Sequence, residues 1–107
     1  MSLDFYLQRV QMTTVFSTNI THNLGTMARE AGIYEALWRP DEYGYTNAGQ
    51  IIPILQKGLL LLESDPARFK KFNSPNGWGM YEDFVPFVRG VLKACEEYPD
   101  TEIAVSR

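Results

Sequence analysis

The spacing of apolar residues changes twice along this chain of 107 residues, and the change limits the folds open to it. Leu3, Phe5 and Leu7 alternate with polar residues, as in a strand with one buried face. From Ile20 onward apolar residues recur every three or four positions, as on one face of a helix. Alternation returns over residues 101–106. The ends of the chain therefore predict strands, and its middle predicts helices.

Strands are predicted over residues 2–9, 13–17 and 101–106, with Gln11 and Met12 in the turn between the first two. The first helix is predicted to start at a cap formed by Thr18 or Asn19 and to stop at Gly32. Four more helices are predicted, over residues 34–37, from a cap at Thr46 or Asn47 to about Glu63, over residues 66–72 after the cap Asp65, and over residues 81–98.

The predicted helical region contains a proline inside a helix, a loop and a turn. Pro53 falls inside the longest one, so that helix either starts late or bends there. Residues 41–45 are predicted as a loop, and residues 73–77 as a turn.

Together these elements predict a single α+β domain over residues 1–107. A small, mainly antiparallel sheet from both chain ends packs against three or four helices. A chain of this length can close a core without disulfides. Cys95, the single cysteine, follows Phe84, Val88 and Leu92 at helical spacing, so we expect a buried, unreactive thiol.

Composition narrows the classes of partner. The net charge of −3 argues against general nucleic-acid binding, which favours a basic excess. The local basic cluster is interpreted as a solvated helix face; it comprises Lys57, Arg68, Lys70 and Lys71. No secretory leader and no membrane-length apolar run is visible, so the expected location is the cytoplasm and no membrane contact is predicted.

Three polar-aromatic blocks contain both tryptophans and the only histidine: residues 19–24 (NITHNL), 37–40 (LWRP) and 76–82 (NGWGMYE). With these blocks the chain resembles a family of small uncharacterised proteins from bacteria and their phages or prophages. The resemblance extends over nearly the whole chain and implies a stand-alone cytosolic accessory protein. That family has no assigned activity, so the resemblance implies no functional residue.

His22 has two interpretations. It is predicted in the first turn of a helix, where free backbone N–H groups favour an anion beside a neutral imidazole. Alternatively, it helps to cap the helix or bonds a loop carbonyl, and this second interpretation is favoured.

Each tryptophan also has two interpretations. Trp38 and Arg39 either offer a stacking face and a guanidinium to a planar or anionic ligand, or Trp38 covers the core while Arg39 pairs with Asp41 or Glu42. The second is favoured. The glycines on either side of Trp78 either present its indole on a loop or let it fold back onto the core, and these alternatives are equally supported.

No catalytic, metal-binding or cofactor motif accompanies the blocks, so no catalytic residue, metal or cofactor is predicted. The preferred hypothesis is a non-enzymatic module that binds a partner protein or a small polar ligand. The alternatives are an enzyme using His22 and Glu82 in acid-base chemistry, and a homodimeric interaction protein. The candidate surface comprises Asn19, His22, Asn23, Trp38, Arg39, Asn76, Trp78, Tyr81 and Glu82.

Overall fold

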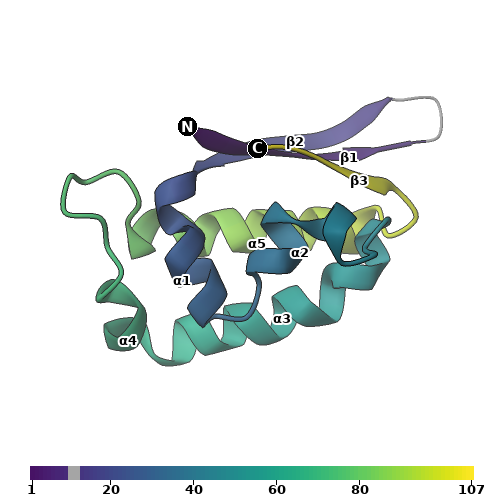
Figure 1. Cartoon of the computed structure of the whole chain (residues 1–107). Helices are drawn as coiled ribbons and strands as arrows, with labels where there is room; N and C mark the ends of the chain where they lie inside the picture. Colours follow the sequence, from purple (N-terminus) through teal and green to yellow (C-terminus); the bar gives the residue numbers. More distant parts are fainter. Residues whose placement is uncertain (10–12) are drawn as a thin grey trace.

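The computed structural model describes residues 1–9 and 13–107, and the predicted turn at Gln11 and Met12 lies outside the described residues. Within those residues three strands form an antiparallel sheet in the order β2-β1-β3: β1 (Ser2–Gln8), β2 (Thr14–Thr21) and β3 (Glu102–Ser106). The helices lie on one face of this sheet, and the two ends of the chain lie close together (Figure 1). The predicted α+β class, with a sheet made from both chain ends, is confirmed.

The described part of the helical layer consists of five α-helices and two short 3₁₀ turns. In chain order they are η1 (His22–Leu24), α1 (Gly25–Glu30), α2 (Tyr34–Trp38), η2 (Pro40–Glu42), α3 (Ala48–Ser64), α4 (Pro66–Lys70) and α5 (Tyr81–Glu97).

Alternation in β1 creates one buried and one open face of the sheet. Leu3, Phe5 and Leu7 are fully buried, whereas the residues between them are only half-buried. Phe5 pairs with Thr18 of β2 and with Val105 of β3, both half-buried, so the face toward the helices continues across all three strands. The large side chains of α3 and α5 complete the core below it.

The long helix α3 does not start late, because Asn47 and Gln50 form a capping box that begins it at Ala48. Pro53 lies inside this helix and on its exposed surface, as Pro86 does in α5. The exposed position leaves room for the proline ring outside the core, although each proline removes one helical hydrogen bond.

The start of the first helix was predicted wrongly. Strand β2 extends to Thr21, and Ile20 pairs with Leu3 instead of joining a helix face. The cap is therefore Thr21, whose hydroxyl accepts a hydrogen bond from the backbone N–H of Asn23 at 3.3 Å, and not Thr18 or Asn19. Pairing with β1 satisfies the backbone of these β-branched residues and outweighs their helical spacing.

Other boundaries differ by small amounts. The helix predicted over residues 66–72 ends at Lys70 as α4, and the predicted loop over residues 41–45 contains part of η2. Gly32 follows α1 with a φ of 78°, the left-handed conformation of a helix stop, as predicted.

Cys95 is fully buried in α5, as predicted. Burial, with a smaller contribution from Glu96, raises the pKa of its thiol to about 12. We therefore expect the native protein to react with a thiol-specific reagent at about pH 8 much more slowly than the urea-unfolded protein does. Rapid labelling of the folded protein would contradict this expectation.

Candidate functional site

Seven of the nine candidate residues line one of two hollows, which lie on either side of η1. The Trp78 hollow measures about 620 Å³, and the candidates in it are Asn19, Asn23, Asn76 and Trp78. The arginine hollow measures about 260 Å³, and the candidates in it are His22, Trp38 and Arg39. Tyr81 and Glu82 line neither of them. The sequence-predicted surface is thus divided by the backbone of His22 and Asn23.

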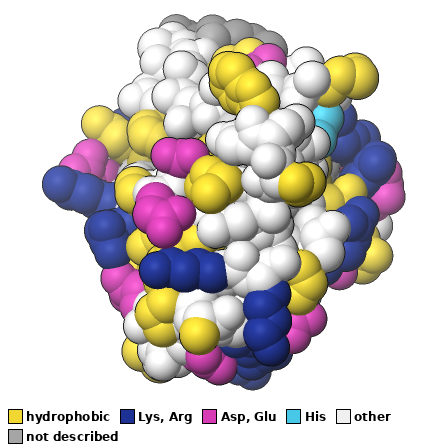
Figure 2. Space-filling view, turned by 90° about the vertical axis from the view of Figure 1, so that its left-hand side faces the viewer, with side chains coloured by type: hydrophobic (Ala, Val, Ile, Leu, Met, Phe, Trp, Pro, Cys, Tyr) yellow, Lys and Arg dark blue, Asp and Glu magenta, His cyan; other side chains and the backbone are white. Residues whose placement is uncertain are grey.

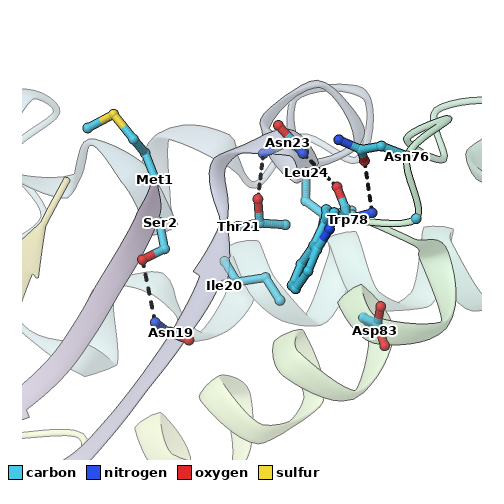
Figure 3. Close-up of a pocket in the computed structure, with 12 residues that line it drawn as sticks. Met1, Ser2, Asn19, Ile20, Thr21, Asn23, Leu24, Asn76, Trp78 and Asp83 are labelled. Carbon is cyan, nitrogen blue, oxygen red and sulfur yellow. Dashed lines mark hydrogen bonds between the residues drawn. The ribbon is translucent and has the colours of Figure 1, made fainter.

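Trp78 is presented to solvent by the loop between α4 and α5. Its side chain is 72% exposed, and Figure 3 shows its ring extending from the loop toward Ile20 of β2. The backbone N–H of Trp78 donates to Oδ1 of Asn76 at 2.9 Å, and its carbonyl accepts from Nδ2 of Asn23 at 2.7 Å. These two hydrogen bonds hold the backbone of Trp78, and so fix the place on the loop from which the indole extends.

The glycines beside Trp78 make this loop geometry accessible. Gly77 has a φ of 79° and Gly79 a φ of 120°, conformations that side chains with a Cβ rarely adopt. Gly79 also passes close to η1, where an added Cβ would lie 2.9 Å from Cβ of Asn23. Of the two interpretations of Trp78, the structure agrees with the exposed indole.

The Trp78 hollow is largely uncharged. Besides the indole it is lined by amide side chains and by Ile20 and Thr21 of β2, and Asp83 is its one charged side chain among the described residues. Figure 2 looks onto this end of the molecule, where charged side chains of both signs lie among broad areas of uncharged surface.

Trp38, in contrast, belongs to the core. It is 2% exposed, and its ring stacks on Tyr34 with the centroids 5.4 Å apart. Its Nε1 donates to Nδ1 of His22 at 2.8 Å. Because an indole N–H only donates, Nδ1 of His22 is the acceptor of this bond. Among the described residues the His22 side chain makes no cap and no bond to a loop carbonyl, so the indole contact replaces the favoured interpretation of this residue.

Arg39 pairs with Glu42 at 3.0 Å, which matches the favoured interpretation of this segment. Arg107 donates to Asp41 at 2.8 Å and to the carbonyl oxygen of Trp38 at 3.0 Å. Hydrogen bonding from Arg107 lowers the pKa of the Asp41 carboxyl below its ordinary value. The C-terminal residue is thereby attached to the segment that follows α2.

Tyr81 and Glu82 have structural partners. The hydroxyl of Tyr81 donates to the carbonyl oxygen of Leu62, and Glu82 lies 3.7 Å from Lys70. Since His22 lines the arginine hollow and Glu82 does not, the structure does not bring the proposed acid-base pair into one hollow.

One edge of β2 is open, and this feature of the site was not predicted from the sequence. Over residues 1–9 and 13–107 no strand pairs with it. The backbone N–H of His22 donates to the carbonyl of Met1, and hydrogen-bonded pairs alternate from there along the antiparallel ladder. The backbone groups of Ser17, Asn19 and Thr21 consequently point away from β1, toward the open edge.

Comparison with protein families, curated proteins and solved structures finds no match to this chain. Among the described helices, none has the length and apolar character needed to cross a membrane. In the same part of the chain, no three metal-ligating side chains come together. The argument for function therefore rests on the two hollows and the open edge of β2.

Proposed function

We propose that this protein is a non-enzymatic binding module that takes an extended segment of a partner protein along the open edge of β2. The observation that carries the proposal is that a 72% exposed indole, attached to a hydrogen-bonded backbone, lines a hollow beside that edge. In keeping with the resemblance of the three blocks, we further propose a bacterial or phage accessory role.

The open edge supplies main-chain binding. The outward N–H and C=O groups of Ser17 and Asn19, together with the outward N–H of Thr21, have the spacing of an unfilled β-ladder. The carbonyl of Thr21 is used, because this cap residue accepts the first hydrogen bond of η1. Two of these residues, Asn19 and Thr21, also line the Trp78 hollow. A segment that pairs with this edge therefore passes the hollow and directs alternate side chains into it.

The Trp78 hollow supplies the side-chain contact. Tryptophan is a frequent anchor of protein interfaces because it buries a large apolar area and loses little conformational entropy. Asp83 complements a cationic side chain, and an indole face also attracts cations. The expected partner segment is extended and carries a lysine or arginine that enters between Trp78 and Asp83.

The test is selection from a display library of short random peptides, followed by fluorescence anisotropy on the enriched sequences. We expect Trp78→Ala to weaken their binding by about 2 kcal/mol, or roughly 30-fold. Its stability should change by no more than about 0.5 kcal/mol, as for other surface substitutions. Absence of any enriched peptide, or equal binding to Trp78→Ala, would contradict the proposal.

A pair of variants at one position tests main-chain pairing separately. Asn19→Pro removes an outward N–H that β1 does not use, and proline is tolerated on edge strands where that group faces solvent. Asn19→Ala removes only the side chain. Circular dichroism checks that both variants are folded. If main-chain pairing binds the peptide, only the proline variant should lose binding.

A second copy of this chain is the competing occupant of the edge. Strand β2 contains neither a charged residue nor a proline, so it lacks two common devices that prevent edges from pairing with one another. Light scattering separates the two cases: a dimer that Asn19→Pro converts to a monomer would assign the edge to self-association.

A further inference from the structure

We infer that the arginine hollow binds a compact oxyanion, a phosphate or carboxylate group. This site is separate from the strand-pairing edge, since η1 places His22 in one hollow and Asn23 in the other. The charged side chains that line it are Arg29, Arg39 and Arg107, and no carboxylate among the described residues lines it. Three arginines thus line one space of about 260 Å³.

Arg29 is the main anion-binding group. Its guanidinium carbon lies 3.8 Å from the ring centre of Tyr34, which fixes the group over the ring. Within the described residues no carboxylate lies within 4.0 Å of its nitrogens. A guanidinium held in this way keeps its N–H donors available at the edge of the plane, where they match the oxygens of an oxyanion.

The other two arginines each have a carboxylate partner. Arg39 pairs with Glu42, and Arg107 pairs with Asp41 and lies 3.8 Å from Glu42. Two carboxylates thus neutralise these two cations, and the positive charge of Arg29 is not neutralised by them. The local excess of one positive charge favours a singly charged or partly protonated anion over a neutral ligand.

The aromatic residues of this hollow do not act as a stacking platform. Arg29 covers one face of the Tyr34 ring, and stacking on Trp38 covers more of that ring. Trp38 itself is only 2% exposed. A planar ligand ring therefore has no free indole face here, contrary to the ligand-stacking interpretation of Trp38. Gly25, with no side chain, leaves space beside Arg29 and Tyr34. The hollow consequently suits a small anionic group without an attached ring in contact.

The experiment uses NMR spectra of the arginine Nε–Hε groups during titration with inorganic phosphate, with sodium acetate and with sodium chloride at matched ionic strength. We expect saturable shifts of Arg29 together with Arg39 or Arg107. Saturation by phosphate alone identifies a phosphate site, and saturation by acetate as well identifies a general oxyanion site. If the shifts do not saturate and match those seen in sodium chloride, the inference is overturned.

Two variants of equal charge change provide the control. Arg29→Gln removes the main binding group and should weaken phosphate binding at least about tenfold. Arg89→Gln removes an exposed arginine of α5 that pairs with Glu63 and does not line the hollow. It should leave phosphate binding unchanged. If both variants weaken binding equally, the effect comes from net charge and the site is disproved. The melting temperatures of both variants check that they are folded.

Discussion

Replacing Trp38 with alanine is expected to lower the free energy of unfolding by about 3–5 kcal/mol, the range for large aromatic residues in a core. The substitution removes a 2% exposed indole, its stacking on Tyr34 and its hydrogen bond to His22. For a domain of this size the melting temperature should fall by about 12 °C or more. Urea denaturation followed by circular dichroism measures the change directly.

Trp38→Phe separates the hydrogen bond from the packing. Phenylalanine keeps a ring that can stack on Tyr34 but has no N–H donor for His22. We expect a smaller loss, of about 1–2 kcal/mol, from the unmade hydrogen bond and the reduced ring volume. If Trp38→Ala changes stability by less than Trp78→Ala does, the assignment of Trp38 to the core is wrong.

The second large effect is expected at Gly58, where α3 passes residues that follow α1. A Cβ at this position would overlap Cγ2 of Ile33 and lie 3.2 Å from the carbonyl oxygen of Ala31. Ile33 is fully buried, and its branched side chain is stiff at χ1. Gly58→Ala should therefore destabilise the fold by about 2 kcal/mol, even though alanine is the better helix former by about 1 kcal/mol.

Gly90 provides the matched control on the other long helix. It lies inside α5, and among the described residues a Cβ built there meets no atom within 4 Å outside its chain neighbours and the backbone of its own helix. Gly90→Ala should stabilise the protein by about 0.5–1 kcal/mol through helix propensity alone. Opposite signs for the two substitutions, measured by thermal unfolding, would establish that close packing requires the glycine at Gly58. Ile33→Ala should also reduce the penalty of Gly58→Ala, since it removes the overlapping methyl group.

The strands at the chain ends and the long helices could be predicted because each has a clear period. The segment around Ile20 could not, because it fits both periods. Ile20, Leu24 and Met27 have helical spacing, whereas residues 13–18 are rich in β-branched residues. Only the pairing of Ile20 with Leu3 decides between them, and that contact is between strands. The error in the helix cap follows from this one ambiguity.

The candidate site was predicted as one surface because its residues share unusual chemistry, and sequence does not show on which side of the backbone each one lies. His22 and Asn23 are adjacent in the chain and line different hollows. Arg29 and Arg107 were missed, since neither belongs to a polar-aromatic block. The fold brings these two residues beside Arg39, and no sequence pattern indicates it.

The position of β1 in the middle of the sheet also has a consequence for the order of folding. Its pairing with β2 is local, whereas Phe5 meets Val105 only after a loop of about a hundred residues closes, at an entropic cost that rises by about 0.6 kcal/mol per doubling of length. We expect the local hairpin to form first, with β1 as a temporary edge. The carboxylate of Asp4 then discourages that edge from pairing with other chains until β3 covers it.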